Sequence, residues 1–327
     1  MREPWFWRSD SLTARAVTGA LFPLSLAYHA GQRLRWAATR PAKPAGPVIC
    51  IGNATLGGVG KTPFAILVHR MLSDTGITSW FLTRGYGGHL QGPARVDANR
   101  MQAAQTGDEA LLLAREGPAM LARNRPDGAR AAFEGGADAV IMDDGFQNPT
   151  LRKTVSILLI DAADPEGNGR IFPAGPLREP VARARTRADI IVAIKRNADA
   201  PASNDLDADF HAWLEPSGDV APQRVVAFTG IGVPSKFFMT LTRSGFDLAA
   251  KVPFADHHPF TAPELAALRR LAKKENATLI TTEKDYVRLP QEARDDILTL
   301  PVTMRINAEE DFKARLLAAI DAGTKAE

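Results

Sequence analysis

Short aliphatic runs, separated by amphipathic stretches, mark the middle of the chain. The runs lie at 48–51, 78–83, 139–142, 155–160 and 189–194. Continuous apolar character over so few residues is typical of strands buried on both faces of a sheet. Apolar residues recur at helical spacing in 62–72 and again in 108–116. This alternation predicts a mainly parallel, doubly wound α/β sheet.

The second half of the chain repeats the alternation after a polar interruption. Residues 197–223 are polar and rich in proline, and they predict a boundary between domains. Beyond the boundary we expect strands at 224–229, 248–254, 278–282 and 300–304, and helices at 234–244, 261–276 and 309–322. The chain is therefore expected to divide into an apolar N-terminal helix (1–40), a larger α/β domain (41–222) and a smaller α/β domain (223–327).

The N-terminal segment differs from the rest because 16–32 contains no Lys, Arg, Asp or Glu. Arg15 precedes it, Arg33 and Arg35 follow it, and tryptophans stand at both borders. It is shorter than the roughly 20 apolar residues of a spanning helix and is interrupted by glycine and proline. Basic flanks with border tryptophans favour a segment lying in the interface of an anionic membrane. The alternatives are a secretory signal, whose cleavage pattern is poor here, and a helix packed on the protein's own core.

Composition limits the classes of protein that the chain fits. With 327 residues, 45% of them hydrophobic, it can bury a sizeable core. The net charge of +3 is small, and no basic run with interleaved aromatics indicates a nucleic-acid partner. The single cysteine, Cys50, lies in the first aliphatic run, where it is expected to pack as a small hydrophobe. One cysteine allows no disulfide within the chain, which favours a cytosolic-side location.

A glycine-rich loop, Ile-Gly-Asn-Ala-Thr-Leu-Gly-Gly-Val-Gly-Lys-Thr at 51–62, joins the first aliphatic run to the first helix. Such loops turn backbone N–H groups around phosphate oxygens, while the lysine reaches the outer phosphates and the following hydroxyl holds Mg²⁺. The loop has Thr55 where the P-loop pattern requires glycine, and Leu56 where partition-type ATPases carry a second lysine. The alternative is a glycine-rich turn with a chance Lys-Thr. We predict a P-loop domain that binds ATP through Asn53, Thr55, Gly57, Gly58, Gly60, Lys61 and Thr62.

Other strand ends carry charge that could reach the same site. Asp143 and Asp144 close the run at 139–142, where the Mg²⁺-linked acid of a nucleotide enzyme belongs. The alternative is that Asp-Asp-Gly only starts a turn. Arg84 follows the run at 78–83 and can bring a cation to the same edge.

Asp108 has two possible roles. It follows Gly107 at the start of a predicted helix, where an aspartate is ordinarily an N-cap. Alternatively, it accepts a proton from a substrate hydroxyl while His257, far along the chain, orients it across a cleft between the domains. Zinc at His257 or His258 is not indicated, because no spaced ligands accompany them. Thr-Glu-Lys-Asp at 282–285 follows a strand, and spacing alone assigns it no chemistry.

Taken together, these motifs resemble the tetraacyldisaccharide 4′-kinase family of the lipid A pathway in Gram-negative bacteria. The resemblance rests on 52–63, Thr-Arg-Gly-Tyr-Gly at 83–87, Gly-Asp-Glu at 107–109, Asp-Asp-Gly-Phe-Gln at 143–147, Pro-Ala-Gly-Pro-Leu-Arg-Glu at 173–179, Phe-Ala-Asp-His-His at 254–258 and 282–285. It implies ATP-dependent phosphorylation of the 4′-hydroxyl of an acylated glucosamine disaccharide 1-phosphate. It also implies roles for single residues: Asp108 as the catalytic base with His257 as its partner, Lys61, Thr62 and Arg84 at the nucleotide, and Thr62, Asp143, Asp144 and Glu179 at Mg²⁺.

The resemblance also implies partners and a place in the cell. We expect an acylated disaccharide lipid as substrate, an anionic membrane surface at the cytoplasmic face of the inner membrane, and no obligate protein partner. The chain departs from the family pattern at Asn148, where a histidine is expected, so a titratable role there is in doubt. The rival hypothesis is a P-loop ATPase switch of the partition or metallochaperone class. A soluble small-molecule kinase or ligase would leave the N-terminal segment unexplained.

Overall fold

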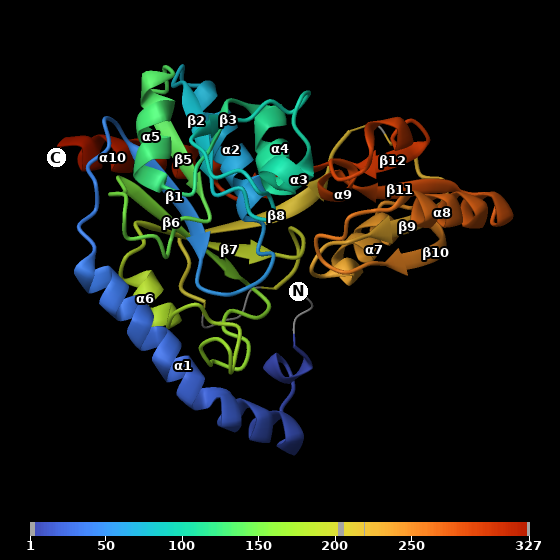
Figure 1. Cartoon of the computed structure of the whole chain (residues 1–327), viewed down its shortest axis with the longest axis horizontal. Helices are drawn as coiled ribbons and strands as arrows, with labels where there is room; N and C mark the ends of the chain where they lie inside the picture. Colours follow the sequence, from blue (N-terminus) through green and yellow to red (C-terminus); the bar gives the residue numbers. More distant parts are fainter. Residues whose placement is uncertain (1–3, 202–205, 219, 326–327) are drawn as a thin grey trace.

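A computed structural model describes residues 4–201, 206–218 and 220–325. Figure 1 shows a large α/β unit, a smaller α/β unit beside it, and a long N-terminal helix below them. Within these described ranges, the two sheets have nine and four strands. The predicted fold class is thereby confirmed.

The large sheet has the order β13-β8-β7-β6-β1-β5-β2-β4-β3. Only the two outermost pairs, β13 with β8 and β3 with β4, are antiparallel. Its strands are β1 (Val48–Asn53), β2 (Ser79–Thr83), β3 (Ala94–Arg95), β4 (Ala119–Leu121), β5 (Ala139–Asp143), β6 (Val155–Asp161), β7 (Ile190–Lys195), β8 (Phe210–Pro216) and β13 (Val302–Ile306). Because β1, β5 and β2 are parallel neighbours, their carboxyl ends meet at one edge of the sheet.

Helices cover both faces of this sheet, and the alternation of side chains along β1 divides the core in two. Ile49 and Ile51 belong to one apolar cluster, and Val48 and Cys50 belong to the other. The helices of this unit are α2 (Lys61–Ser73), α3 (Ala103–Thr106), α4 (Asp108–Glu116), α5 (Arg125–Glu134), α6 (Val181–Arg185) and α10 (Glu309–Lys325). Cys50 is fully buried, as its position in an aliphatic strand predicts.

The small sheet has the order β10-β9-β11-β12, with all strands parallel. Its elements are β9 (Arg224–Thr229), α7 (Pro234–Arg243), β10 (Asp247–Pro253), α8 (Ala262–Lys274), β11 (Thr278–Thr282), α9 (Glu283–Tyr286), η2 (Gln291–Ala293) and β12 (Ile297–Leu300). A Thr261–Glu264 capping box starts α8, which explains why the sequence pattern located this helix well.

The C-terminal elements do not belong to the small unit, where the sequence pattern had placed them. The strand expected at 300–304 is two strands: β12 ends at Leu300, and β13 pairs with β8 of the large sheet. Phe312 of α10 then packs edge-to-face against Phe64 and Phe210 of the large unit. A short apolar run predicts a strand but not the strand with which it pairs. Here the partner is β8, which lies in the polar stretch 197–223 and was not predicted as a strand.

That polar stretch was expected to be a domain boundary, yet it contains β8. The strand lies next to the edge of the sheet, and its second half is exposed, so its sequence reads as polar. Residues 202–205 and 219 of the stretch lie outside the described residues.

The N-terminal segment forms η1 (Trp5–Trp7) and the single long helix α1 (Leu12–Ala38), with Pro23 inside it. Ser11 caps α1 by accepting a hydrogen bond from the Ala14 N–H. Only Ala14, Thr18 and Ser25 of the helix are buried. Across the described ranges, no helix has both the length and the apolar character needed to cross a membrane.

Candidate active site

The glycine-rich loop connects β1 to α2 at the carboxyl edge of the large sheet. Gly57 and Gly60 adopt φ of 123° and 94°, a backbone region that favours glycine. Gly60 is the N-cap of α2, so the first N–H groups of that helix face the loop. Lys61 directs its Nζ back to Asn53 Oδ1, 3.2 Å away. This geometry is compatible with a phosphate-binding loop, and the individual contacts to ATP stay predictions.

Thr55, the departure from the usual pattern, is held by side-chain and backbone contacts. Its hydroxyl accepts a hydrogen bond of 3.1 Å from Asn53 Nδ2, and its backbone forms a bridge with Leu177. On either side of Thr55, the Leu56 N–H donates to the Pro176 carbonyl at 2.7 Å, and the Arg178 N–H donates to the Ala54 carbonyl at 2.7 Å. The segment 176–178 therefore braces the loop from outside.

Asp143 ends β5 beside β1 and accepts a hydrogen bond of 2.9 Å from the Thr62 hydroxyl. Its other oxygen, Oδ1, is buried and has no hydrogen-bond partner. Burial, then the charges of Glu109 and Asp144, raise the pKa of Asp143 to about 7. A buried oxygen without a donor, next to a hydroxyl that follows the P-loop lysine, fits a ligand of Mg²⁺.

Asp144 has a different environment, although it is the next residue. Its φ of 52° is left-handed, an uncommon conformation that often marks functional positions. Arg178 binds both of its oxygens, at 2.8 and 3.1 Å, and Lys61 Nζ lies 3.8 Å from Oδ1. Burial acts to raise the pKa of Asp144, but Lys61 and Arg178 overcome it and hold the pKa below its ordinary value. The pair therefore holds one carboxylate as an anion and leaves the other poised to bind a cation.

Glu179, which we expected at the metal, makes other contacts. Both of its oxygens accept hydrogen bonds of 2.7 Å from Arg187. Gln147 Nε2 also donates to Glu179 at 3.0 Å and to the Asn53 carbonyl at 2.8 Å, so Glu179 braces the end of β1. No group of three or more His, Cys, Asp or Glu side chains is placed to hold a metal ion in the described part of the chain. The geometry favours Thr62 and Asp143 as the residues for Mg²⁺, and Asp144 and Glu179 at the metal stay predictions.

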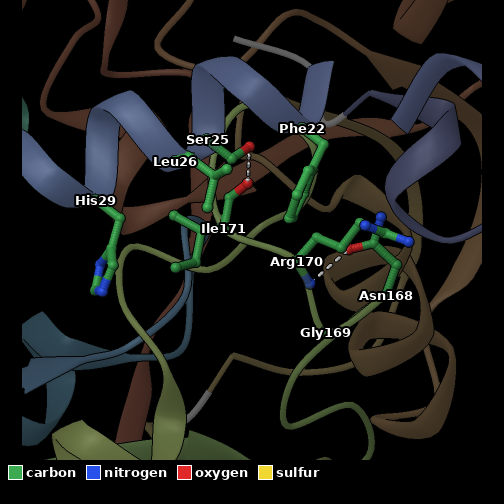
Figure 2. A pocket seen from close by; sticks show the side chains of 8 residues that line it. All are labelled: Phe22, Ser25, Leu26, His29, Asn168, Gly169, Arg170 and Ile171. Carbon is green, nitrogen blue, oxygen red and sulfur yellow. Dashed lines mark hydrogen bonds between the residues drawn. The ribbon is translucent and has the colours of Figure 1, made fainter. Parts of the chain in front are cut away.

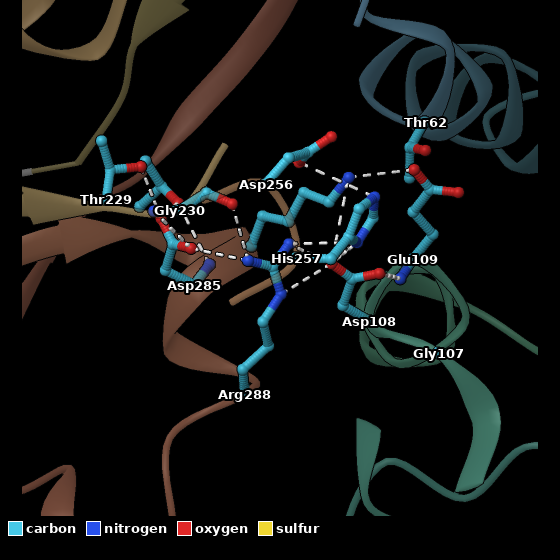
Figure 3. A network of polar contacts seen from close by, with 12 residues as sticks. Thr62, Gly107, Asp108, Glu109, Thr229, Gly230, Asp256, His257, Asp285 and Arg288 are labelled. Atoms are coloured by element: carbon cyan, nitrogen blue, oxygen red, sulfur yellow. Dashed lines mark hydrogen bonds and ion pairs between the residues drawn. The ribbon is translucent and has the colours of Figure 1, made fainter. Parts of the chain in front are cut away.

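Asp108 is the first residue of α4, and Gly107 is the N-cap. The Asp108 side chain points toward the small unit (Figure 3), while its Oδ1 accepts a hydrogen bond of 3.0 Å from the Glu109 N–H in the first turn of α4. Asp108 Oδ2 lies 3.0 Å from His257 Nδ1 and 2.8 Å from Arg288 Nε. The two units thus meet at the pair of residues that the resemblance singled out.

The charge state of Asp108 follows from its neighbours. The side chain is 3% exposed, and burial acts to raise its pKa. The hydrogen bond from His257 and the charges of Lys284 and Arg288 outweigh burial and hold the pKa of Asp108 well below its ordinary range. The carboxylate is therefore an anion at neutral pH and acts as a hydrogen-bond acceptor.

Glu109 lies between the pair formed by Asp108 and His257 and the nucleotide side of the site. Its carboxylate contributes to the raised pKa of Asp143 and also accepts a hydrogen bond of 3.0 Å from Lys284 Nζ. Figure 3 shows Glu109 between Thr62 and the pair formed by Asp108 and His257. Arg84, in contrast, follows β2 at the same edge but is exposed and has no hydrogen bond or ion pair within the described residues.

Several site residues were given no role by sequence reasoning: Gln147 and Arg178 lie inside the family motifs, whereas Arg125, Arg187 and Arg288 lie outside them. Four arginines surround the carboxylates of the site. Arg125 lies near Asp143 and Asp144, Arg178 binds Asp144, Arg187 binds Glu179, and Arg288 binds Asp108. Gln147 supplies an amide that donates to Glu179. Burial lowers the pKa of Arg125 to about 10, against the charges of Asp143 and Asp144. The available signal was the density of charge in 173–179, which contained Arg178; nothing in the sequence pointed to Arg288.

Asn148, where the resemblance led us to expect histidine, makes local contacts. Its Oδ1 accepts hydrogen bonds from the Thr150 N–H at 2.8 Å and the Thr150 hydroxyl at 2.7 Å. This is an Asx turn, which closes the chain after the Asp-Asp-Gly-Phe-Gln segment.

A cavity of about 400 Å³ lies along α1 (Figure 2). It is lined by Phe22, Ser25, Leu26 and His29 of the helix and by residues 168–171. Ser25 joins the two walls, because its hydroxyl donates to the Ile171 carbonyl at 2.7 Å and accepts from the Ala174 N–H at 3.1 Å. The residues on which α1 rests therefore come shortly before the segment 176–178 that braces the P-loop.

A glycine-rich loop followed by Lys61 and Thr62, with Asp143 at the end of the neighbouring parallel strand, defines the class of P-loop nucleotide-binding proteins. Comparison with known proteins then specifies the family. Residues 17–321 match the family model described as Tetraacyldisaccharide-1-P 4′-kinase. The chain belongs to the tetraacyldisaccharide 4′-kinase family.

Individual relatives agree over nearly the whole length. The chain is 45% identical to the tetraacyldisaccharide 4′-kinase of Rhodospirillum centenum, covering 99% of this chain and 98% of that one. It is 44% identical to that of Dinoroseobacter shibae, covering 97% of each. The solved structure described as the "apo" form of LpxK from Aquifex aeolicus in complex with ATP covers 93% of this chain and 99% of its own, with 25% identity and a TM-score of 0.76. The predictions of family, kinase activity and ATP as cofactor are confirmed, and the rival ATPase switch is not supported.

Proposed function

We propose that the protein transfers the γ-phosphoryl group of ATP to the 4′-hydroxyl of an acylated disaccharide 1-phosphate held in a membrane. The observation that carries this proposal is the meeting of Asp108 and His257 next to Glu109, beside Thr62 and Asp143. An acceptor-directed carboxylate and a phosphate cradle at one place are what transfer to a hydroxyl requires.

On the nucleotide side, the backbone of 55–60 and Lys61 bind the phosphates. Thr62 and Asp143 would hold Mg²⁺, with the buried Asp143 Oδ1 directed to it, and a bound Mg²⁺ supplies neutralisation of charge on the β- and γ-phosphates. Asp144 and Arg178 fix the end of β5 behind this site.

On the acceptor side, Asp108 orients the sugar hydroxyl and accepts its proton, while His257 holds the carboxylate in place. In phosphoryl transfer, positioning and charge contribute more than early removal of the proton. A carboxylate that stays ionised at neutral pH suits this role, because it offers a charged acceptor to the hydroxyl in every turnover.

The helix α1 gives the proposal its membrane component. Among the described residues, six of the nine large apolar side chains that are most exposed lie on η1 or α1: Trp5, Leu12, Phe22, Leu24, Leu26 and Leu34. Arg33 and Arg35 stand on the same helix and suit anionic head groups. We place the protein peripherally on the cytoplasmic face of the inner membrane, with α1 in the interface and the cavity of Figure 2 near the lipid.

The test is turnover of ATP with and without acylated disaccharide 1-phosphate in detergent, followed by analysis of which hydroxyl carries the new phosphate. We expect lipid-dependent ATP consumption and a 4′-phosphate product. ATP consumption indifferent to the lipid would contradict the proposal, and phosphate on another hydroxyl would correct the acceptor position.

A further inference from the structure

Arg288 links the two units of the molecule through a buried side chain. It stands just after α9, and its side chain is 5% exposed. Nε donates to Asp108 Oδ2 at 2.8 Å, and Nη2 donates to the same oxygen. Nη1 donates backward, to the Gly230 carbonyl at 2.9 Å and to Asp285 Oδ1 at 2.8 Å. The guanidinium thus connects the carboxylate on α4 to the frame of the small sheet (Figure 3).

Asp285 makes this connection rigid. It is fully buried and accepts hydrogen bonds from the Thr229 hydroxyl at 2.6 Å, the Gly230 N–H at 3.0 Å and the Thr282 hydroxyl at 2.7 Å. Thr282 in turn caps α9 through the Asp285 N–H. A buried carboxylate with this many donors has one position, and it fixes the guanidinium that it faces. Spacing alone assigned no chemistry to the Thr-Glu-Lys-Asp segment at 282–285. In the structure, its last residue, Asp285, holds Arg288 in place.

The two carboxylate oxygens of Asp108 have different hydrogen-bond partners. Oδ2 takes His257 and Arg288. Oδ1 has one described partner, the N–H of the adjacent Glu109, at 3.0 Å. Because a carboxylate oxygen can accept two hydrogen bonds, Oδ1 keeps capacity for a substrate hydroxyl.

We propose that Arg288, held by Asp285, is a positioning residue for phosphoryl transfer: it fixes Asp108 Oδ2 so that Oδ1 is presented to the acceptor hydroxyl. This inference rests on the proposed role of Asp108. Arg288 contacts the reaction only through that carboxylate, and it ties the competent geometry to contact between the units. Lysine is an incomplete substitute, because it lacks the planar fork that reaches Asp108 and Asp285 together.

Arg288 also affects the charge of Asp108. The charged and titratable groups that face Asp108 are His257, Lys284 and Arg288 from the small unit and Glu109 from its own helix. Removing Arg288 takes away a cation while burial, which opposes ionisation, persists. The pKa of Asp108 then rises, so the acidic limb of kcat/KM for the acceptor moves to higher pH.

The experiment is a double-mutant cycle with Arg288→Ala, Arg288→Lys, Asp108→Asn and Arg288→Ala/Asp108→Asn, assayed with acylated disaccharide 1-phosphate in detergent. We expect Arg288→Ala to lower kcat about 10- to 100-fold, with the KM for ATP unchanged and the acidic limb shifted upward. Arg288→Lys should recover part of that loss. In the Asp108→Asn background, removal of Arg288 should change turnover by less than about 2-fold, since the group it positions is already disabled.

Two further variants keep the result interpretable. Arg269→Ala breaks a surface ion pair with Asp296 in the same unit and should leave turnover unchanged. Asp285→Asn keeps an acceptor for Gly230 but removes the charge that holds Arg288, and it should lower kcat in a folded protein without the upward pH shift, because the Arg288 cation is still present. If Arg288→Ala costs as much with Asn at 108 as with Asp, Arg288 acts independently and the inference fails. If Asp108→Asn alone has normal turnover, the proposed role of Asp108 fails instead.

Discussion

The two sides of the active site are built in different ways. On the nucleotide side, the loop 51–62 and the strand end at Asp143 come from β1 and β5, two adjacent parallel strands of one sheet. On the acceptor side, Asp108 meets His257 and Arg288 from 149 and 180 positions away, in another unit. The phosphate-binding side is therefore built within one unit, whereas the acceptor-directed carboxylate depends on how two units come together.

Removing the P-loop lysine should have the largest effect, because no other side chain in the loop brings a cation to the phosphates. We expect Lys61→Ala to lower kcat/KM for ATP by about 10³-fold, measured with saturating acceptor. The matched control is Lys236→Ala, which removes a half-exposed lysine paired with Asp161 and should leave the kinetics unchanged. Normal kinetics for Lys61→Ala would contradict the assignment of loop 51–62 as the ATP-binding loop.

Asp108→Asn should separate the acceptor side from the nucleotide side. We expect kcat to fall about 10²- to 10³-fold, with nucleotide affinity retained in a binding assay with a fluorescent ATP analogue. Asp127→Asn is the control, because Asp127 also lies in the first turn of a helix but only pairs with Arg130 on the surface. Equal, small effects of the two substitutions would reduce Asp108 to a helix residue.

How far the sequence could predict the site follows from the same comparison. The glycines of the loop, Lys61, Thr62 and Asp143 were found because each occupies a defined place relative to a strand or a helix start. The resemblance places Glu179 at the metal, and this stays a prediction. In the structure, both oxygens of Glu179 accept hydrogen bonds from Arg187. Arg288 could not be found, because a single arginine after a short helix has no periodicity or spacing. The return of β13 to the large sheet was missed for a similar reason: a strand pattern does not specify its partner.

Acid stability should report the contact between the units. Since the folded pKa of Asp108 lies below its ordinary value of 3.8, its ion pairs contribute fully above about pH 4, and the contribution is lost as pH falls through the folded pKa. We expect Asp108→Asn to lower the free energy of unfolding by about 2 kcal/mol at pH 6. The difference from the wild type should shrink toward pH 2 in urea titrations. A difference that is constant with pH would show that the charge of Asp108 does not hold the units together.

The exposed face of α1 lies outside both the nucleotide side and the acceptor side of the active site. Changing it tests whether the enzyme reaches its lipid acceptor by binding the membrane surface. Leu24 and Leu26 are 58% and 55% exposed, and burying one leucine is worth about 1.5–3 kcal/mol. We expect Leu26→Asp to weaken sedimentation with anionic phospholipid vesicles about tenfold, with the KM for ATP unchanged. Met239→Asp, on the exposed side of α7, is the control. Equal vesicle binding of all three proteins would contradict an interfacial role for α1.

Asn148 should have the smallest effect, and it shows how a family position can change its task. Asn148 Oδ1 holds the Thr150 N–H and hydroxyl, so Asn148→Ala should cost about 1 kcal/mol of folding stability, read from thermal unfolding. Because the contact is local, kcat and its dependence on Mg²⁺ concentration should stay within about 2-fold of the wild type, a loss smaller than one hydrogen bond would cause in the transition state. A loss of turnover that excess Mg²⁺ restores would instead place this amide at the metal. The position would then belong to the nucleotide side, and the residue change would have altered the chemistry rather than the turn.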